Sequence, residues 1–266
     1  MSVWTKSGFL LGMLLSFQGV GAAELVKVPA GSFVMGCSKG DKACAADETP
    51  ALKVAVPAFQ IDAQEVSVAD YRACVSAGKC KPLKTHSLNK YCNYDAPQRD
   101  AHPVNCIDWA DAQNYCATQG KRLPREAEWE KAARAGSVTP YYWGRQASCR
   151  EAIGNDGKTT GSVKGEMDGC GEDRTWPVAS RAANAWGVYD MLGNAGEWVA
   201  NGYAPDALAR YAKGELDYPA KSDERVVRGG SWDEKVKNLR ASFRNSKPPI
   251  SGDVVYGSIG FRCARD

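Results

Sequence analysis

Ten cysteines dominate the reactive side chains of this 266-residue chain, and two histidines accompany them. An even number of cysteines is typical of a disulfide framework in an exported protein. No two cysteines have the Cys-x-x-Cys spacing, and two histidines are too few for a zinc or copper site of ordinary ligand spacing. The sequence therefore predicts ten structural cysteines: Cys37, Cys44, Cys74, Cys80, Cys92, Cys106, Cys116, Cys149, Cys170 and Cys263.

A short acidic turn carries the second chemical signal. Asp190 and Glu197 place two carboxylates and the intervening peptide carbonyls around one small loop. Hard oxygen donors of this kind are the ligands that calcium prefers. The alternative is a solvated acidic turn anchored by Trp198. We favour calcium as the cofactor of this loop.

The first residues predict export. Lys6 precedes an apolar run over residues 8–17, and small residues follow as far as Ala23. This is the layout of a secretory signal peptide, and its apolar core is too short to span a bilayer. We expect residues 1–23 to be removed and residues 24–266 to form one periplasmic domain without a membrane span.

The net charge limits the classes of partner. The formal charge is +3, which is close to neutral for a chain of this length. This balance gives no electrostatic argument for nucleic acid or an anionic membrane. We therefore expect neither as a partner.

The sequence contains three signals that are typical of the start of a helix. Ser67 with Asp70 and Asp108 with Asp111 resemble capping boxes, and Pro124 is suited to the first position of a third helix. These signals predict three helices in the first half of the chain.

Short strands and long loops are expected elsewhere. Residues 24–33 alternate between apolar and polar types, and residues 226–227 and 259–263 form short apolar runs. Residues 147–185 are rich in Gly, Asp, Thr and Ser and show little periodicity. A loop of that length needs disulfides or bound calcium to stay ordered. The predicted class is α+β with much irregular structure.

Several segments, taken together and in order, carry a family resemblance. They are Val28-Pro-Ala-Gly-Ser-Phe-Val-Met-Gly36, His102-Pro-Val104 with Trp109, Gly120-Lys-Arg-Leu-Pro-Arg-Glu-Ala-Glu-Trp-Glu130, Gly187-Val-Tyr-Asp-Met-Leu-Gly-Asn-Ala-Gly-Glu-Trp198, Arg228-Gly-Gly-Ser-Trp232 and Gly260-Phe-Arg-Cys263. This pattern resembles the formylglycine-generating enzyme, or sulfatase-modifying factor, family. The resemblance implies one disulfide-bonded α+β domain with the C-type-lectin-like fold of that family.

The resemblance also implies a ligand set for calcium. Asp190 and Glu197 would bind through their side chains, and Gly193 and Ala195 through their main-chain carbonyls. Aspartate stands at 190 where the family often has asparagine, which preserves an oxygen donor.

The catalytic positions of the family are changed in this chain. Catalytic relatives carry two cysteines that bind copper for the oxygen-dependent oxidation of a substrate cysteine, and those positions hold Glu234 and Leu239 here. One carboxylate and one leucine cannot replace two soft thiolates. We therefore expect no catalytic residues, and we expect Ser231, Trp232 and Glu234 to mark the former substrate groove.

Disulfide pairing is indicated in part. The resemblance pairs Cys116 with Cys263, and a bridge across so long a loop would contribute roughly 4–5 kcal/mol in the chain-entropy model. Spacing alone does not determine the other pairs. Proximity along the chain suggests Cys37–Cys44, Cys74–Cys80, Cys92–Cys106 and Cys149–Cys170.

Within the family, the chain most resembles periplasmic regulators of bacterial type VI secretion that lack the cysteine pair. The resemblance implies binding to the periplasmic domain of a membrane threonine kinase, promotion of kinase activation, and an outer-membrane lipoprotein as a second partner.

Two alternatives remain open at this point. One is a periplasmic oxidative tailoring enzyme of siderophore maturation, in which Glu234 would act as a general base; an exposed surface charge is the simpler role for that residue. The other is a calcium-dependent carbohydrate-binding module, with Tyr141, Tyr142 or Trp143 as exposed stacking residues. Fold analogy alone is weak evidence for ligand class.

Overall fold

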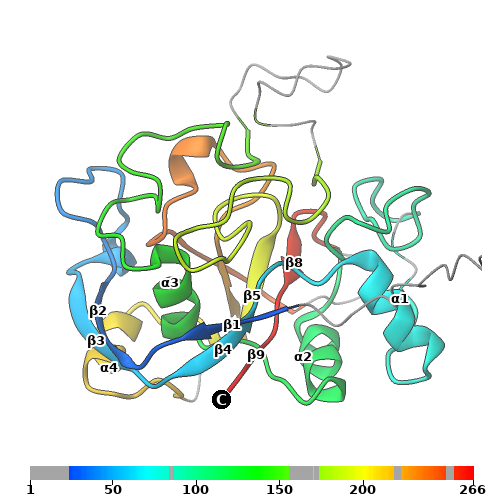
Figure 1. Ribbon diagram of the computed structural model, residues 1–266, viewed down its shortest axis with the longest axis horizontal. Helices are drawn as coiled ribbons and strands as arrows, with labels where there is room; N and C mark the ends of the chain where they lie inside the picture. Colours follow the sequence, from blue (N-terminus) through cyan, green and yellow to red (C-terminus); the bar gives the residue numbers. More distant parts are fainter. Residues whose placement is uncertain are drawn as a thin grey trace, which may run out of the picture.

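The structure is a computed structural model that describes residues 24–83, 85, 87–155, 170, 174–218, 223–249 and 255–266 (Figure 1). The predicted signal peptide lies outside the described residues. The elements in chain order are β1 (Leu25–Val28), β2 (Gly31–Met35), η1 (Ala46–Glu48), β3 (Leu52–Val56), β4 (Phe59–Asp62), α1 (Val68–Ser76), α2 (Trp109–Thr118), α3 (Glu126–Arg134), β5 (Gly196–Gly202), α4 (Ala207–Ala212), β6 (Arg225–Arg228), η2 (Val236–Asn238), β7 (Arg244–Lys247), β8 (Ile259–Phe261) and β9 (Ala264–Arg265).

The strands form three small sheets. Their orders are β1-β4-β9, β2-β3 and β7-β6-β5-β8. All pairings are antiparallel except that of β5 with β8, which is parallel. Short strands, few helices and long connections confirm the predicted α+β class.

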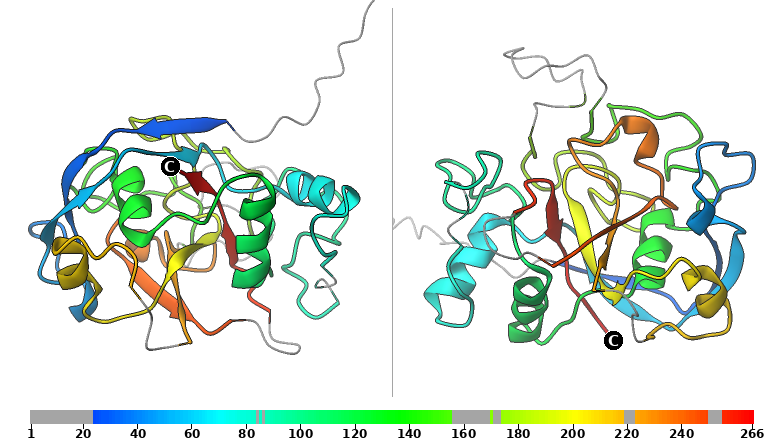
Figure 2. Two further views of the ribbon diagram at one scale, coloured as in Figure 1. Left: turned by 90° about the horizontal axis from the view of Figure 1, so that it is seen from below. Right: turned by 180° about the vertical axis from the view of Figure 1, so that it is seen from behind.

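Helix α3 lies on one side of the β5–β8 pair and α1 and α2 lie on the other (Figures 1 and 2). The buried side chains form two clusters. One surrounds α3 and includes Trp129 together with residues of β2, β3 and β6. The other packs α1 and α2 against Trp198 and Phe261. The β5–β8 pair therefore joins the two halves of the core and positions the residues that follow each strand.

The capping residue expected for α1 is present. Ser67 Oγ accepts the Asp70 backbone N–H at 3.1 Å, and the Asp70 carboxylate accepts the Ser67 N–H at 3.2 Å. At α2, Asp108 caps the helix through the Ala110 N–H. Both starts agree with the sequence pattern.

The third helix begins later than predicted. It starts at Glu126 and not at Pro124, because Arg125 is extended and donates its backbone N–H to the Glu128 carboxylate at 2.8 Å. The side chain of Glu128 thus satisfies a free donor at the helix start.

Two predicted strands are divided. Residues 24–33 form β1 and the start of β2, which are separated by Pro29 and Ala30. Residues 259–263 contain β8, and Cys263 lies between β8 and β9. The change of partner explains the second break, because β8 pairs with β5 whereas β9 pairs with β4.

Five disulfides use all ten cysteines. The pairs are those expected from the sequence: Cys37–Cys44, Cys74–Cys80, Cys92–Cys106, Cys116–Cys263 and Cys149–Cys170. Among the described residues, no helix has both the length and the apolar character needed to cross a bilayer.

Candidate functional site

The segment after β6 contains the two positions at which catalytic relatives would have cysteines. Leu239 follows the short helix η2 and is completely buried in the α3 cluster. A methyl group added to Gly154 or Gly230 would lie 2.7 or 2.6 Å from a methyl carbon of Leu239. The leucine side chain therefore fills the space above these two glycines and has a packing role.

Glu234 lies on the same segment but keeps partial contact with solvent. Its Oε2 accepts a hydrogen bond from the Asn238 side chain at 3.1 Å, and its carbonyl accepts the Asn155 N–H at 2.7 Å. Among the described residues, no second acidic or basic side chain forms a hydrogen bond or ion pair with its carboxylate. The arrangement holds Glu234 in place without giving it a proton-transfer partner.

Ser231 and Trp232 are tied into their surroundings. The Ser231 hydroxyl donates to the Asp233 carboxylate, and the Trp232 indole N–H donates to the Gly257 carbonyl at 3.1 Å. The Trp232 ring also contacts the Tyr91 ring, with 4.9 Å between centroids. The expected groove residues Ser231, Trp232 and Glu234 are thus neighbours on one loop that leads from β6 to η2.

The backbone links this loop to the predicted calcium loop. The Trp232 N–H donates to the Asn194 carbonyl at 2.8 Å, and the Gly193 N–H donates to the Gly229 carbonyl at 3.0 Å. Gly193 has φ +99°, and a Cβ at this position would lie 2.3 Å from the Ile153 carbonyl oxygen. Only glycine can adopt this φ and lie this close to the Ile153 carbonyl group.

Asp190 is buried at the start of the predicted calcium loop. Its Oδ2 accepts the Ala179 N–H at 2.6 Å. Burial raises the pKa of the Asp190 carboxyl to about 6, and the Glu197 carboxylate adds to the increase. The side chain is therefore a buried acid whose ionised form is disfavoured unless a positive charge lies nearby.

Glu197 is the second residue of β5 and already has strong hydrogen-bond partners. Its oxygens accept hydrogen bonds from Arg262 Nη2 at 2.7 Å, from Arg262 Nε at 2.8 and 3.0 Å, and from the Trp129 indole N–H at 2.7 Å. Such a bidentate guanidinium pair is among the strongest hydrogen-bonded contacts in proteins.

Glu65 is a member of this group that the sequence motifs do not reveal. It is fully buried and accepts the Ala195 N–H at 2.9 Å and the Asn194 side-chain amide at 2.7 Å. Burial, Asp190 and Glu197 raise its pKa well above the ordinary value. Glu65 comes just before α1, about 130 positions from the loop that it supports, so no local spacing could have indicated it.

The donor set fits calcium in part. Asp190, Glu65 and Glu197 are buried acids, and the Glu197 carboxylate helps to raise the pKa of both Asp190 and Glu65, whereas Arg262 lowers both. The three acids outnumber this buried guanidinium. A bound cation would offset the excess negative charge, but Arg262 and Trp129 occupy the Glu197 oxygens. Among the described residues, neither Asp190 nor Glu197 belongs to a compact group of three His, Cys, Asp or Glu ligand atoms.

The aromatic residues considered for sugar stacking are less exposed than the sequence suggested. Tyr141 is buried, stacks on Trp143 with 5.0 Å between centroids, and donates its hydroxyl to the Lys237 carbonyl at 3.2 Å. Tyr142 and Trp143 are half-buried against the α3 cluster. These rings pack against each other and against the core, so they present little free surface on which a sugar could stack.

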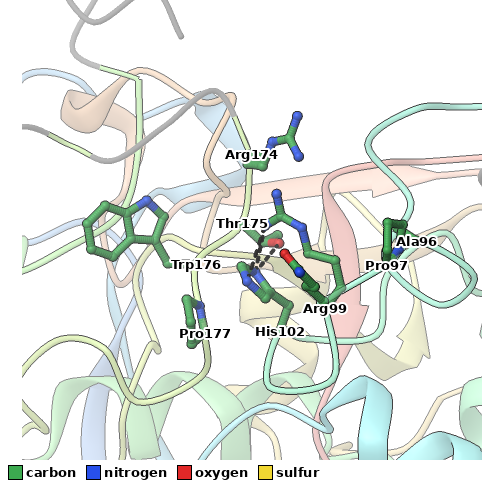
Figure 3. A pocket seen from close by; sticks show the side chains of 9 residues that line it. Ala96, Pro97, Arg99, His102, Arg174, Thr175, Trp176 and Pro177 are labelled. Atoms are coloured by element: carbon green, nitrogen blue, oxygen red, sulfur yellow. Dashed lines mark hydrogen bonds between the residues drawn. The ribbon is translucent and has the colours of Figure 1, made fainter. Parts of the chain in front are cut away.

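A pocket of about 660 Å³ opens beside His102 (Figure 3). Its floor contains Thr175, whose hydroxyl accepts the Asn93 side-chain amide at 2.8 Å and lies 3.4 Å from His102 Nδ1. Burial lowers the pKa of His102 to about 4, and Arg99 adds to this effect. The imidazole is therefore neutral near pH 7. Glu234 does not line this pocket.

Comparison with known proteins gives consistent matches across the chain. Residues 16–266 match the model of the sulfatase-modifying factor enzyme 1-like domain. The formylglycine-generating enzyme of Streptomyces coelicolor is 29% identical over 287 residues, which cover 91% of this chain and 88% of that protein. The serine/threonine-protein kinase pkn1 of Chlamydia caviae is 30% identical over 255 residues, covering 91% of this chain and 38% of the kinase. The structure of PvdO from Pseudomonas aeruginosa superposes with a TM-score of 0.72 and 29% identity, covering 92% and 94% of the two chains.

Proposed function

We propose, because the chain belongs to the sulfatase-modifying factor enzyme 1-like family, that it is a non-catalytic periplasmic member that acts by binding a protein partner. One observation carries this proposal: the two positions of the family's catalytic cysteines hold Glu234 and a completely buried Leu239. A leucine that packs on Gly154 and Gly230 has neither a thiol nor contact with solvent. All ten cysteines are in disulfides, so none of them supplies a thiolate instead.

The proposed partner is the periplasmic domain of a membrane threonine kinase, as for the TagR regulator of type VI secretion, with an outer-membrane lipoprotein as a second partner. Support comes from the chlamydial kinase pkn1, in which a segment similar to 91% of this chain is part of a protein named as a kinase. The five disulfides favour a location in an oxidising compartment such as the periplasm, where the protein would encounter such a kinase domain.

The test is co-purification of envelope proteins on the exported, disulfide-bonded protein, followed by an assay of kinase autophosphorylation. Recovery of a membrane kinase whose autophosphorylation rises on addition of the protein is the expected result. Glu234→Ala is the matched variant and should retain the kinase, because a binding function does not need a general base. Failure to retain any protein partner, together with co-purification of a small molecule, would reject the proposal.

A second candidate is an oxidative tailoring enzyme like PvdO, and the structural likeness to PvdO across 92% of this chain favours it. Glu234 would then serve as the general base. Under this alternative, Glu234→Ala abolishes product formation while the fold is kept. The same variant therefore separates the two functions.

We also propose that the loop containing Asp190, Gly193, Ala195 and Glu197 binds one calcium ion, which would offset the charge of the buried acids. Protonation of Glu65 is the competing way to neutralise this charge. Thorough chelation should lower the melting temperature of the wild type and leave Asp190→Ala unchanged, with re-addition of calcium restoring only the wild type. A wild-type melting curve that does not respond to chelation would favour protonation of Glu65.

A further inference from the structure

A second pocket, of about 410 Å³, lies between β2 and the last turn of α3. Residues 29–34 form one wall, and Lys131, Arg134 and residues 136–138 form another. Trp186 completes the lining. Figure 1 shows α3 beside β2 and β3, the two strands of one small sheet. This pocket shares no lining residue with the predicted calcium loop or with the former catalytic positions.

The lining carries exposed apolar side chains. Three large hydrophobic side chains are exposed among the described residues, and two of them, Val34 and Val138, line this pocket. Val34 is 53% exposed and Val138 is 71% exposed. The half-buried Phe33 and Trp186 belong to the same lining. Exposed apolar side chains that gather around one pocket indicate a binding site, whereas the same side chains scattered singly would not.

Lys131 adds a buried positive charge to this apolar lining. The residue is only 5% exposed, and its ammonium donates to the carbonyls of Pro29 at 2.6 Å and Gly31 at 3.0 Å. No carboxylate of the described residues pairs with this ammonium, and burial lowers the pKa of Lys131. Because an ammonium has three N–H donors and the two carbonyls use two, one donor is left for a ligand.

The other polar side chains of the lining favour a ligand with a single charged end. Arg134 already donates to Glu130 at 2.9 Å, and the Ser137 hydroxyl hydrogen-bonds with the Thr139 hydroxyl at 2.6 Å. A peptide would bring backbone amides that need partners of their own. A carboxylate joined to an alkyl chain needs one cation, which Lys131 supplies, and an apolar wall. The volume of the pocket falls in the range of small-molecule sites.

We propose that this pocket binds a medium-chain alkyl carboxylate. The carboxylate accepts the remaining N–H of Lys131, and the alkyl chain lies against Val34, Val138 and Trp186. The site is separate from the proposed interaction with a protein partner, and either can fail without the other.

The experiment measures binding of octanoate to the disulfide-bonded protein by isothermal titration calorimetry. Three further probes are 1-octanol, which lacks the charge, acetate, which lacks the chain, and a short acetylated peptide with a free C-terminal valine. Lys131→Met removes the ammonium and keeps an unbranched side chain, and Lys213→Met is its control, because Lys213 is exposed after α4 and outside this pocket.

A second variant keeps the inference testable if Lys131→Met does not fold, since Lys131 also anchors the turn between β1 and β2. Val138→Ser changes an exposed side chain and leaves the ammonium in place. Its control is Leu88→Ser, because Leu88 is 47% exposed and does not line this pocket. Circular dichroism and thermal melting show which variants fold.

We expect the wild type to bind octanoate about tenfold more tightly than 1-octanol and acetate. Lys131→Met should bind octanoate about tenfold more weakly and 1-octanol as the wild type does. Val138→Ser should weaken octanoate binding about threefold, because the chain loses apolar contact. Both control variants should bind octanoate as the wild type does.

Several results would overturn the inference. One is a folded wild type that does not bind octanoate, and another is equal binding of octanoate and 1-octanol. Octanoate binding that is unchanged in folded Lys131→Met, or unchanged in Val138→Ser, would also overturn it. Tighter binding of the valine peptide than of octanoate would assign the pocket to a peptide end instead.

Discussion

Glu234 and Leu239 stand five positions apart, yet they have unlike surroundings. Leu239 packs against glycines in the core, whereas Glu234 is half-buried and accepts from Asn238. The sequence motif predicted the loss of the thiols at these positions. It could not predict that a leucine would be used for packing, because Gly154 lies on a loop 85 positions away.

His102 gives a prediction at the residue scale. Folding lowers its pKa from the ordinary 6.5 to about 4, since burial and Arg99 disfavour the imidazolium. A group with a depressed folded-state pKa contributes stability that is complete above pH 6.5 and is lost as the pH falls towards 4. The contribution is at most about 3 kcal/mol, and solvent at the open side of the pocket reduces it to about 2 kcal/mol.

Urea unfolding of the wild type and of His102→Gln at pH 7 and at pH 4.5 measures this contribution. Carboxylates titrate in the same range in both proteins, so the informative quantity is the difference between the two losses of unfolding free energy. The wild type should lose about 2 kcal/mol more than the variant over this interval. Parallel losses in the two proteins would show that His102 has the same pKa folded and unfolded.

At the scale of elements, α3 is buried along its whole length although it contains five charged residues. Ion pairs with arginines of other elements offset the free-energy cost of removing these charges from water. Glu130 is the central case: its Oε1 accepts the Gly36 N–H at 2.8 Å and Arg134 Nε at 2.9 Å, and its Oε2 accepts Arg228 Nη2 at 2.6 Å. One carboxylate of the helix thus binds both the residue that follows β2 and Arg228 of β6.

Glu130→Gln tests this contribution of α3. The substitution leaves Arg228 and Arg134 buried without their full counter-charge, and breaking a buried pair in this way costs about 3–5 kcal/mol. Asp206→Asn is the control, because its pair with Arg210 is exposed and the substitution should change the free energy of unfolding far less than Glu130→Gln does. Both values come from chemical denaturation at neutral pH. Equal effects of the two substitutions would contradict the role assigned to α3.

The sequence predicted where the helices lie better than it predicted which distant residues contact the acidic turn. Ser67 with Asp70 marks the start of α1 because a capping box is a local device. The start of α3 was misplaced by two residues, because the Glu128 side chain extends the cap back to Arg125. Glu65 and Arg262 could not have been placed beside the acidic turn from spacing, since both contacts depend on how distant segments meet.

At the scale of the whole molecule, β5 joins the two core clusters, because its Trp198 belongs to one and Val199 to the other. The disulfide between Cys116 on α2 and Cys263 lies within the cluster of α1 and α2. This bridge spans 147 residues, whereas Cys74–Cys80 spans 6. The longer bridge restricts most of the unfolded chain, and the shorter one restricts a single turn after α1.

Removing each bridge separately gives the last prediction. In the chain-entropy model, the loss of unfolding free energy is about 5 kcal/mol for Cys116→Ala with Cys263→Ala and about 2 kcal/mol for Cys74→Ala with Cys80→Ala. All four side chains are buried, so the two pairs of substitutions remove similar packing and differ chiefly in loop length. Denaturant unfolding of both variants under oxidising conditions measures the difference. A smaller loss for the Cys116–Cys263 pair than for Cys74–Cys80 would contradict the prediction that loop length in the unfolded chain sets the contribution of each bridge.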